Sequence, residues 1–358
     1  MNNNPYERLA HRLDELPNGF PSTPDGIELK LLAHLYTPEE ADLAARLRLT
    51  LETPAQIAAR VGADPQALRS MLKSMARRGL IAAGRVEEGL GYGLMPFVVG
   101  IYEMQVASLD AEMARLFEDY YQQAFGQILA IQPSVHRVIP VEESLKTGIE
   151  IQPYESAAEI VRSAKAWGVL ECICRKQKAL LGEPCGHPLD VCMALSQQPG
   201  AFDQSQVVHA LSEAEALETL ARAAKAGLVH SVSNSLHGLS YICNCCTCSC
   251  GVLRGIAELG VLNAVARSAF INTVDEDRCN GCESCLEGCQ FNALHLELVM
   301  TVDALHCVGC GVCVPLCPEE ALSLVRRDDS AAEQPPADMD EWRKQRAAAR
   351  HIDLSKVL

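Results

Sequence analysis

The chain has 358 residues, 17 of them cysteine, with 48% hydrophobic residues and a formal net charge of −15. This length allows two or three domains with ordinary hydrophobic cores, and the composition is that of a globular protein. The N-terminal residues lack the apolar segment of a signal peptide, and the longest apolar stretch, within residues 93–102, is too short to cross a bilayer. We therefore expect a soluble, cytoplasmic protein without membrane insertion. Its thiols would be kept reduced for metal or redox chemistry rather than forming disulfides.

The acidity is concentrated near the C-terminal end. Residues 1–100 carry 11 basic and 12 acidic side chains, whereas residues 270–325 carry one arginine and nine acidic side chains. An acidic surface of this kind favours docking to a basic protein, here a redox partner, over binding to nucleic acid.

Residues 27–100, which follow an N-terminal extension over 1–26, predict a winged helix-turn-helix domain. Thr37, Thr53 and Asp64 each precede a proline and provide helix N-caps, the first two within capping boxes. The segment 80–95 then has two short apolar runs around a glycine-rich turn, which predicts a β-hairpin wing.

The third of these helices carries Arg69, Lys73 and Arg77 on one face. Such a stripe meets phosphates or base edges in DNA-binding proteins. An ordinary solvated face is the alternative. Because this domain is nearly neutral and the chain is acidic, DNA is the less favoured partner.

Residues 101–268 predict a mostly helical, cysteine-rich middle domain that begins with a long amphipathic helix from Gly100. A second helix is capped by Ser212 and Glu215 and stops at Gly227. The domain contains nine cysteines in two groups, and neither group has a common zinc spacing: Cys172, Cys174, Cys185 and Cys192, then Cys243, Cys245, Cys246, Cys248 and Cys250.

Residues 273–294 and 301–322 form an internal repeat at an offset of 28 residues. Each copy contains the spacing C-x-x-C-x-x-C-x-x-x-C, which suits thiolates wrapped around a cubane cluster. Glycines at 281, 309 and 311 let the backbone curl closely around such a group. A pair of zinc sites is the less favoured alternative, since zinc motifs usually pair separate C-x-x-C knuckles.

On these motifs, residues 269–326 resemble the two-cluster bacterial ferredoxins. The resemblance implies two [4Fe-4S] clusters, one bound by Cys279, Cys282, Cys285 and Cys317 and the other by Cys307, Cys310, Cys313 and Cys289. Gln290 departs from the pattern, because a proline usually follows the fourth cysteine, as Pro318 does in the second copy.

The wider combination of CICR, CNCC and a paired ferredoxin module resembles a family of larger 4Fe-4S proteins found mainly in bacteria with anaerobic metabolism. For the nine middle cysteines we favour an additional iron–sulfur cluster, with zinc or metal-free redox thiols as alternatives. His187 is a weaker candidate ligand, and Arg175 and Lys176 are candidates for offsetting the charge of a cluster.

The fold expected is therefore an α+β multidomain chain: a winged helix-turn-helix, a mostly helical middle domain and a ferredoxin-like 2[4Fe-4S] module. Residues 327–358 would form a linker and a C-terminal helix. The chain has no P-loop and no dinucleotide fingerprint, so no nucleotide cofactor is expected.

The leading hypothesis is an electron-transfer protein that relays single electrons to or from a protein partner. Alternatives are a redox-responsive transcriptional regulator and a subunit of a larger reductase. Whether the protein is itself an enzyme stays open at this point, and no catalytic residue is assigned.

Overall fold

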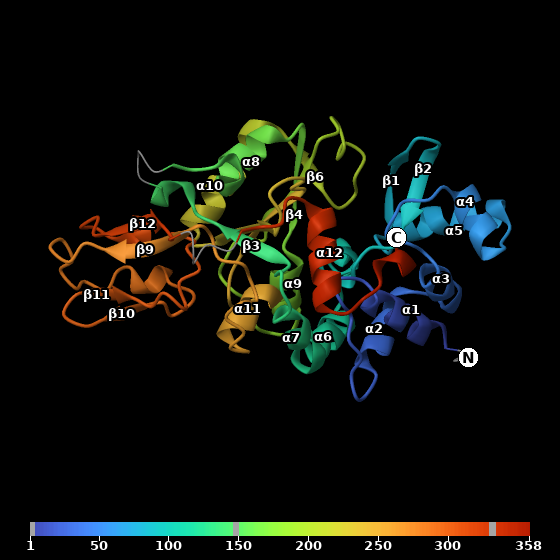
Figure 1. Ribbon diagram of the computed structural model, residues 1–358, viewed down its shortest axis with the longest axis horizontal. Coiled ribbons are helices and arrows are strands. Elements are labelled where there is room, and N and C mark those ends of the chain that lie inside the picture. The colour runs from blue at the N-terminus through green and yellow to red at the C-terminus, as the bar shows by residue number, and fades with distance from the viewer. Residues whose placement is uncertain (1–3, 146–149, 329–333) are drawn as a thin grey trace. The chain divides into compact units, whose positions relative to one another are not determined.

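The computed structural model describes residues 4–145, 150–328 and 334–358, and their contacts divide the chain into two compact units (Figure 1). The first unit extends to Gln132 and includes residues 180–182 and 343–358; the second comprises Pro133–Ala179 and Glu183–Trp342. Residues 101–132, expected to begin the middle domain, fall in the first unit. Residues 329–333 of the expected linker lie outside the described residues.

The first unit is built from helices and one β-hairpin. α1 (Pro5–Asp14) lies within the expected N-terminal extension and buries leucines at positions 9 and 13. The remaining elements of residues 27–100 are α2 (Ile27–Leu35), α3 (Pro38–Ala44), α4 (Pro54–Val61), α5 (Pro65–Arg77), β1 (Ala82–Val86) and β2 (Gly89–Gly93).

The three predicted helix starts are confirmed. Thr37 and Glu40 form a complete capping box at α3, and Thr53 and Gln56 form one at α4. At α5 the Asp64 carboxylate accepts the backbone N–H of the third helical residue at 2.8 Å. Each side chain satisfies an N–H that the helix leaves unpaired, which is why these residues set the helix starts.

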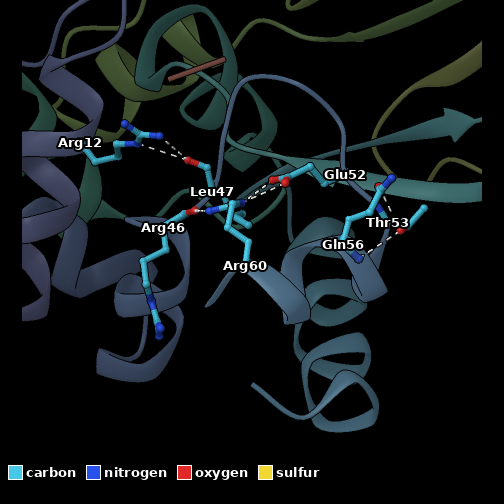
Figure 2. A network of polar contacts seen from close by, with 7 residues as sticks. All are labelled: Arg12, Arg46, Leu47, Glu52, Thr53, Gln56 and Arg60. Carbon is cyan, nitrogen blue, oxygen red and sulfur yellow. Dashed lines mark hydrogen bonds and ion pairs between the residues drawn. The ribbon is translucent and has the colours of Figure 1, made fainter. Parts of the chain in front are cut away.

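A polar network joins the loop after α3 to the neighbouring helices (Figure 2). Arg60 on α4 donates to the Glu52 carboxylate at 2.9 Å and to the Arg46 carbonyl at 2.6 Å. Arg12 on α1 donates to the Leu47 carbonyl at 3.0 Å. The hairpin β1–β2 follows α5 in antiparallel register, as predicted (Figure 1).

The predicted long helix from Gly100 is not continuous. α6 (Ala111–Tyr120) begins at Asp110, whose side chain accepts the N–H of Met113 at 2.8 Å, and after one wider turn α7 (Gly126–Leu129) completes the segment. Aspartate is more favourable at the N-cap of a helix than in its interior. Asp110 therefore starts a new helix, although the residues on both sides of it follow a helical hydrophobic pattern.

The second unit contains a six-stranded antiparallel sheet in the order β3-β7-β8-β5-β4-β6. Its strands are β3 (His136–Ile139), β4 (Ala166–Glu171), β5 (Asp190–Ser196), β6 (His209–Leu211), β7 (Val229–Ser233) and β8 (Tyr241–Cys245). The accompanying helices are α8 (Ala157–Ser163), α9 (Ile173–Leu180), α10 (Glu213–Lys225) and α11 (Gly251–Ala257).

This sheet corrects the expectation of a mostly helical middle domain. The burial of β5 alternates along the strand, and Met193 and Leu195 contribute to a core that also contains Val161 of α8 and Leu220 of α10. In the sequence, short strands with a period of two are harder to recognise than a helix with a complete capping box such as α10. The strands are stabilised by the packing of α8 and α10 onto one face of the sheet.

Residues 270–326 carry two short antiparallel pairs (Figure 1). β9 (Phe270–Val274) pairs with β12 (Leu322–Arg326), and β10 (Leu294–Leu296) pairs with β11 (Met300–Val302). Each pair joins one strand of the first repeat copy to one of the second, so the two copies interlock.

The C-terminal segment forms α12 (Met339–Ala349). Its Arg346 is fully buried and donates to the carbonyls of Pro17 at 3.0 Å and Ile128 at 2.7 Å. This helix therefore anchors to its own chain. None of the helices in the described ranges is both long and apolar enough to span a bilayer.

Candidate metal centres

The first cluster cavity lies in the 270–326 module, and its cysteines are Cys279, Cys282, Cys285 and Cys317. Three come from the first repeat copy and the fourth from the second copy. The structure thus brings together the four thiols that the ferredoxin resemblance groups.

The second cluster cavity repeats this arrangement with the copies exchanged. Its cysteines are Cys307, Cys310, Cys313 and Cys289. A short 3-10 turn, Leu286–Gly288, separates Cys285 of the first cavity from Cys289 of the second.

Backbone amides point at the sulfurs in both cavities. The N–H groups of Ala293 and Ala321 donate to the Sγ atoms of Cys289 and Cys317, each at 3.3 Å. The N–H of Met300 donates to Cys279 Sγ at 3.4 Å. Such donors stabilise negative charge on thiolates and influence the reduction potential of a bound cluster.

Glycine is required at two of the turns around the second cavity. Gly309 and Gly311 both have φ of +72°, and a Cβ atom at either would lie 2.1 Å from an oxygen, the Phe270 carbonyl or the Ser144 hydroxyl. The backbone therefore approaches its neighbours too closely for any side chain.

The 4Fe-4S binding domain family matches residues 272–295 and again residues 300–323. The chain contains two 4Fe-4S binding motifs. They fit two [4Fe-4S] clusters, and the two cysteine-lined cavities fit the same pair of groups. No curated protein and no solved structure gave a significant match to this chain.

The two cavities differ in exposure. Cys282 is exposed, and a hydrogen bond from Ser284 lowers the pKa of its thiol. Its counterpart in the repeat, Cys310, is only partly exposed, and burial raises the pKa of that thiol to about 12. At this position the first cavity is therefore more open to solvent than the second.

The sheet brings the two middle cysteine groups together. β5 and β8 are antiparallel neighbours in which Met193 pairs with Ile242, and continuing this register by one residue places Cys192 opposite Cys243. The grouping therefore depends on strand order, and α10, which lies between the two groups in the sequence, packs on the sheet.

Six of the nine middle thiols form one contiguous set, called here the six-thiol set. Hydrogen bonds from Cys174 and Cys192 hold the pKa of the Cys172 thiol well below its ordinary value. Hydrogen bonds with Cys243 and Cys250 raise the pKa of Cys245. The Cys174 and Cys250 thiols also shift each other's pKa, raising that of Cys174 and lowering that of Cys250, which closes the set. Its members are Cys172, Cys174, Cys192, Cys243, Cys245 and Cys250.

The other three middle thiols lie with a histidine in a second set, called here the Cys3His set. The ligand atoms of Cys185, His187, Cys246 and Cys248 all lie within 4.8 Å of one another. Burial raises the pKa of Cys185, but hydrogen bonds from Ser249 and His187 outweigh it and lower the value to about 6. His187, a weak candidate in the sequence, is thus one of four convergent donors.

Arg175 lies between the two sets and is 1% exposed. Its guanidinium donates to the carbonyls of Pro188, at 2.7 Å, and Asn244. Burial lowers the pKa of Arg175, but the thiols of Cys172 and Cys246 raise it by more than burial lowers it. The guanidinium therefore stays cationic. Lys176, also a candidate for charge compensation, instead pairs with Glu171 at 2.9 Å.

Two buried side chains beside the six-thiol set have nitrogens with no hydrogen-bond partner among the described residues. They are Arg175, at Nε, and His136 on β3, at both ring nitrogens. Burial lowers the pKa of His136, and the nearby Cys250 thiol acts against that shift. Buried donors without partners are rare in proteins, and two beside six thiols suit a negatively charged group bound there. Sequence reasoning missed His136, because a single histidine in a strand has no motif to mark it.

Proposed function

We propose that this protein transfers single electrons through two [4Fe-4S] clusters in the 270–326 module, to or from another protein. The observation that carries the proposal is the exchange of the fourth cysteine between two cavities matched by 4Fe-4S binding motifs. Since Cys285 and Cys289 are separated only by one 3-10 turn, clusters in the two cavities would be close neighbours. Stepwise electron transfer requires that successive clusters lie close to each other.

Electrons would enter or leave through the first cluster cavity. Cys282 is exposed there, and the carboxylates of Glu283 and Glu319 lie on the same rim. An acidic rim beside an exposed thiolate favours docking of a basic redox partner at the point where the distance to a cluster is shortest.

The six-thiol set would bind a third, polynuclear iron–sulfur centre. Six thiols, three of them on buried residues, exceed what a single ion needs, and Arg175 supplies one positive charge beside them. Nε of Arg175 and one ring nitrogen of His136, which have no hydrogen-bond partner among the described residues, would donate to the thiolates or to the centre itself. Whether this centre has an open coordination site decides if the protein is an enzyme or a carrier.

The test is a spectroelectrochemical titration of anaerobically purified protein, followed by mixing the reduced protein with a basic redox protein. We expect reversible bleaching of the visible absorbance, and transfer to the basic acceptor that slows as salt is added. A double variant, Glu283→Gln with Glu319→Gln, should transfer electrons to the acceptor more slowly at low salt, and its cluster content should be unchanged. Absence of a reversible redox change, or transfer indifferent to both salt and the two carboxylates, would contradict the proposal.

A redox-responsive regulator is the second candidate, and the surface of α5 is the observation that favours it. Arg69, Lys73 and Arg77 are all exposed and have no ion pair with any described residue. Arg78, beside them, instead pairs with Glu40 at 2.7 Å. The test is binding to the DNA upstream of the protein's own gene at low salt. Binding that is lost when all three stripe residues become alanine would support a winged-helix regulator, and failure of both holo and apo protein to bind would exclude it. Co-purification of a tightly bound partner would instead indicate a reductase subunit.

A further inference from the structure

We propose that the Cys3His set binds one tetrahedral zinc ion, separate from every iron–sulfur centre of the chain. The middle region would then contain two centres of different chemistry. The proposal goes beyond electron transfer, because it depends on the geometry of four ligands and not on the redox activity of the module.

The spacing of the four ligand atoms carries the argument. Zinc binds thiolate sulfur at about 2.3 Å and imidazole nitrogen at about 2.0 Å, so three sulfurs and one nitrogen at the corners of one tetrahedron stand roughly 3.5–3.8 Å apart. All four ligand atoms of the set lie within 4.8 Å of one another, and His187 Nδ1 lies 3.9 Å from Cys248 Sγ. Thiolates that bind a cubane each reach a different iron and must stand further apart. The set is therefore the size of a single ion.

The donor types agree with zinc. Three thiols and one imidazole form a Cys3His combination, which is common in structural zinc sites. Two segments each supply two ligands with one residue between them, Cys185-Gly-His187 and Cys246-Thr-Cys248. Four protein ligands leave no open position, so the ion would have a structural role.

Residues around the set hold the thiols in place. Ser249, which is 1% exposed, donates to Cys185 Sγ at 3.5 Å and to Cys248 Sγ at 3.9 Å. Cys246 is 1% exposed and packs with Val191 and Leu228. Outer hydrogen bonds of this kind orient metal ligands, and their presence shows that the thiols are positioned rather than merely near one another.

The position of the set indicates what the ion would stabilise. It would tie the loop before β5 to the loop after β8. Within the second loop, the backbone N–H of Thr247 donates to Gln290 Oε1 at 2.8 Å, and Gln290 Nε2 donates to the Gly227 carbonyl. Gln290 directly follows Cys289 of the second cluster cavity. The ion would therefore anchor the loop against which that end of the ferredoxin module is hydrogen-bonded.

The experiment measures zinc, iron and acid-labile sulfide per chain on full-length protein reconstituted anaerobically with all three. We expect about one zinc per chain in the wild type. His187→Ala and Cys248→Ser should lose the zinc and retain the iron of the wild type. Cys192→Ser, a cysteine variant in the six-thiol set, is the matched control and should retain zinc. Retention of about eight iron per chain, the content of the two clusters in the 270–326 module, reports that a variant has folded.

Two further measurements keep the proposal falsifiable if a ligand variant proves unstable. Cobalt(II) in place of zinc should give the intense thiolate charge-transfer bands of a tetrahedral site in the wild type. Ser249→Ala should keep the fold and weaken zinc binding by about 10-fold, the effect expected of an outer hydrogen bond. The proposal is overturned if the wild type with full iron binds no zinc, if His187→Ala and Cys248→Ser keep it, or if these variants lose iron in place of zinc.

Discussion

The two copies of the cysteine repeat share their spacing but not their surroundings. In the first copy the middle cysteine, Cys282, is exposed beside acidic side chains, whereas Cys310 in the second copy is only partly exposed. Glu283 occupies the first-copy position of Gly311, with φ of +62°. Gln290 occupies that of Pro318 and hydrogen-bonds to the loop after β8. The spacing thus determines which thiols meet, and the neighbouring residues give each cavity its own solvent access and attachment.

Making the second copy resemble the first at the glycine turn should have the largest effect on the stability of the protein. In Gly311→Glu a side chain would enter a site where Cβ lies 2.1 Å from the Ser144 hydroxyl, on a backbone with φ of +72°. Left-handed strain and overpacking together cost about 2–5 kcal/mol. We expect a lower unfolding temperature and the loss of the iron bound in the second cavity. A variant with wild-type stability and iron content would show that the turn around this cavity is not constrained.

Removing the attachment of the first copy should have the next largest effect. Gln290→Ala removes the hydrogen bonds to Thr247 and Gly227, which together contribute about 1–3 kcal/mol. Chemical denaturation of the holo protein measures the change. Gln122→Ala, on an exposed helix surface, is the control and should change stability by less than about 0.5 kcal/mol. Equal effects of the two substitutions would mean that the Gln290 contacts do not hold the module.

The difference in exposure predicts the order in which iron is lost. A chelator should remove iron from the first cavity before the second, because Cys282 is exposed and Cys310 is only partly exposed. We expect two phases whose rates differ by about tenfold, equivalent to about 1.4 kcal/mol in activation free energy. Cys282→Ser should abolish the fast phase selectively. A single phase in the wild type would contradict the inferred difference in access.

The smallest effect is expected from making the first copy resemble the second. Glu283→Gly relieves a non-glycine residue in the left-handed region, and the gain is partly offset by the greater freedom of glycine in the unfolded chain. Thermal unfolding should show a stabilisation of up to about 1 kcal/mol. Destabilisation would mean that the Glu283 side chain makes a contact more important than the backbone strain.

How much could be predicted from the sequence depends on how far apart the cooperating residues lie. The helix starts at Thr37, Thr53 and Asp64 follow from local hydrogen bonding, and the structure confirms them. The two 4Fe-4S motifs are also local, because their spacing is set within one repeat.

The middle region could not be predicted in the same way. Its division into six thiols and a Cys3His set depends on β5 lying beside β8, and adjacent cysteines are separated: Cys245 belongs to one set and Cys246 to the other. Strands of three to seven residues carry little periodic signal, so neither the sheet nor this division is visible in cysteine spacing. The winged-helix assignment stays a prediction, since the helices and hairpin are present but their role has not been tested.

The most direct test of the central claim is the iron and acid-labile sulfide content of the anaerobically purified protein. Two clusters in the 270–326 module require about eight iron and eight sulfide per chain, and a further cluster in the six-thiol set raises both to about twelve. Cys289→Ser and Cys317→Ser should each lower the iron of one cavity and leave the other. Four or fewer iron per chain, with zinc in the module in place of iron, would contradict the account.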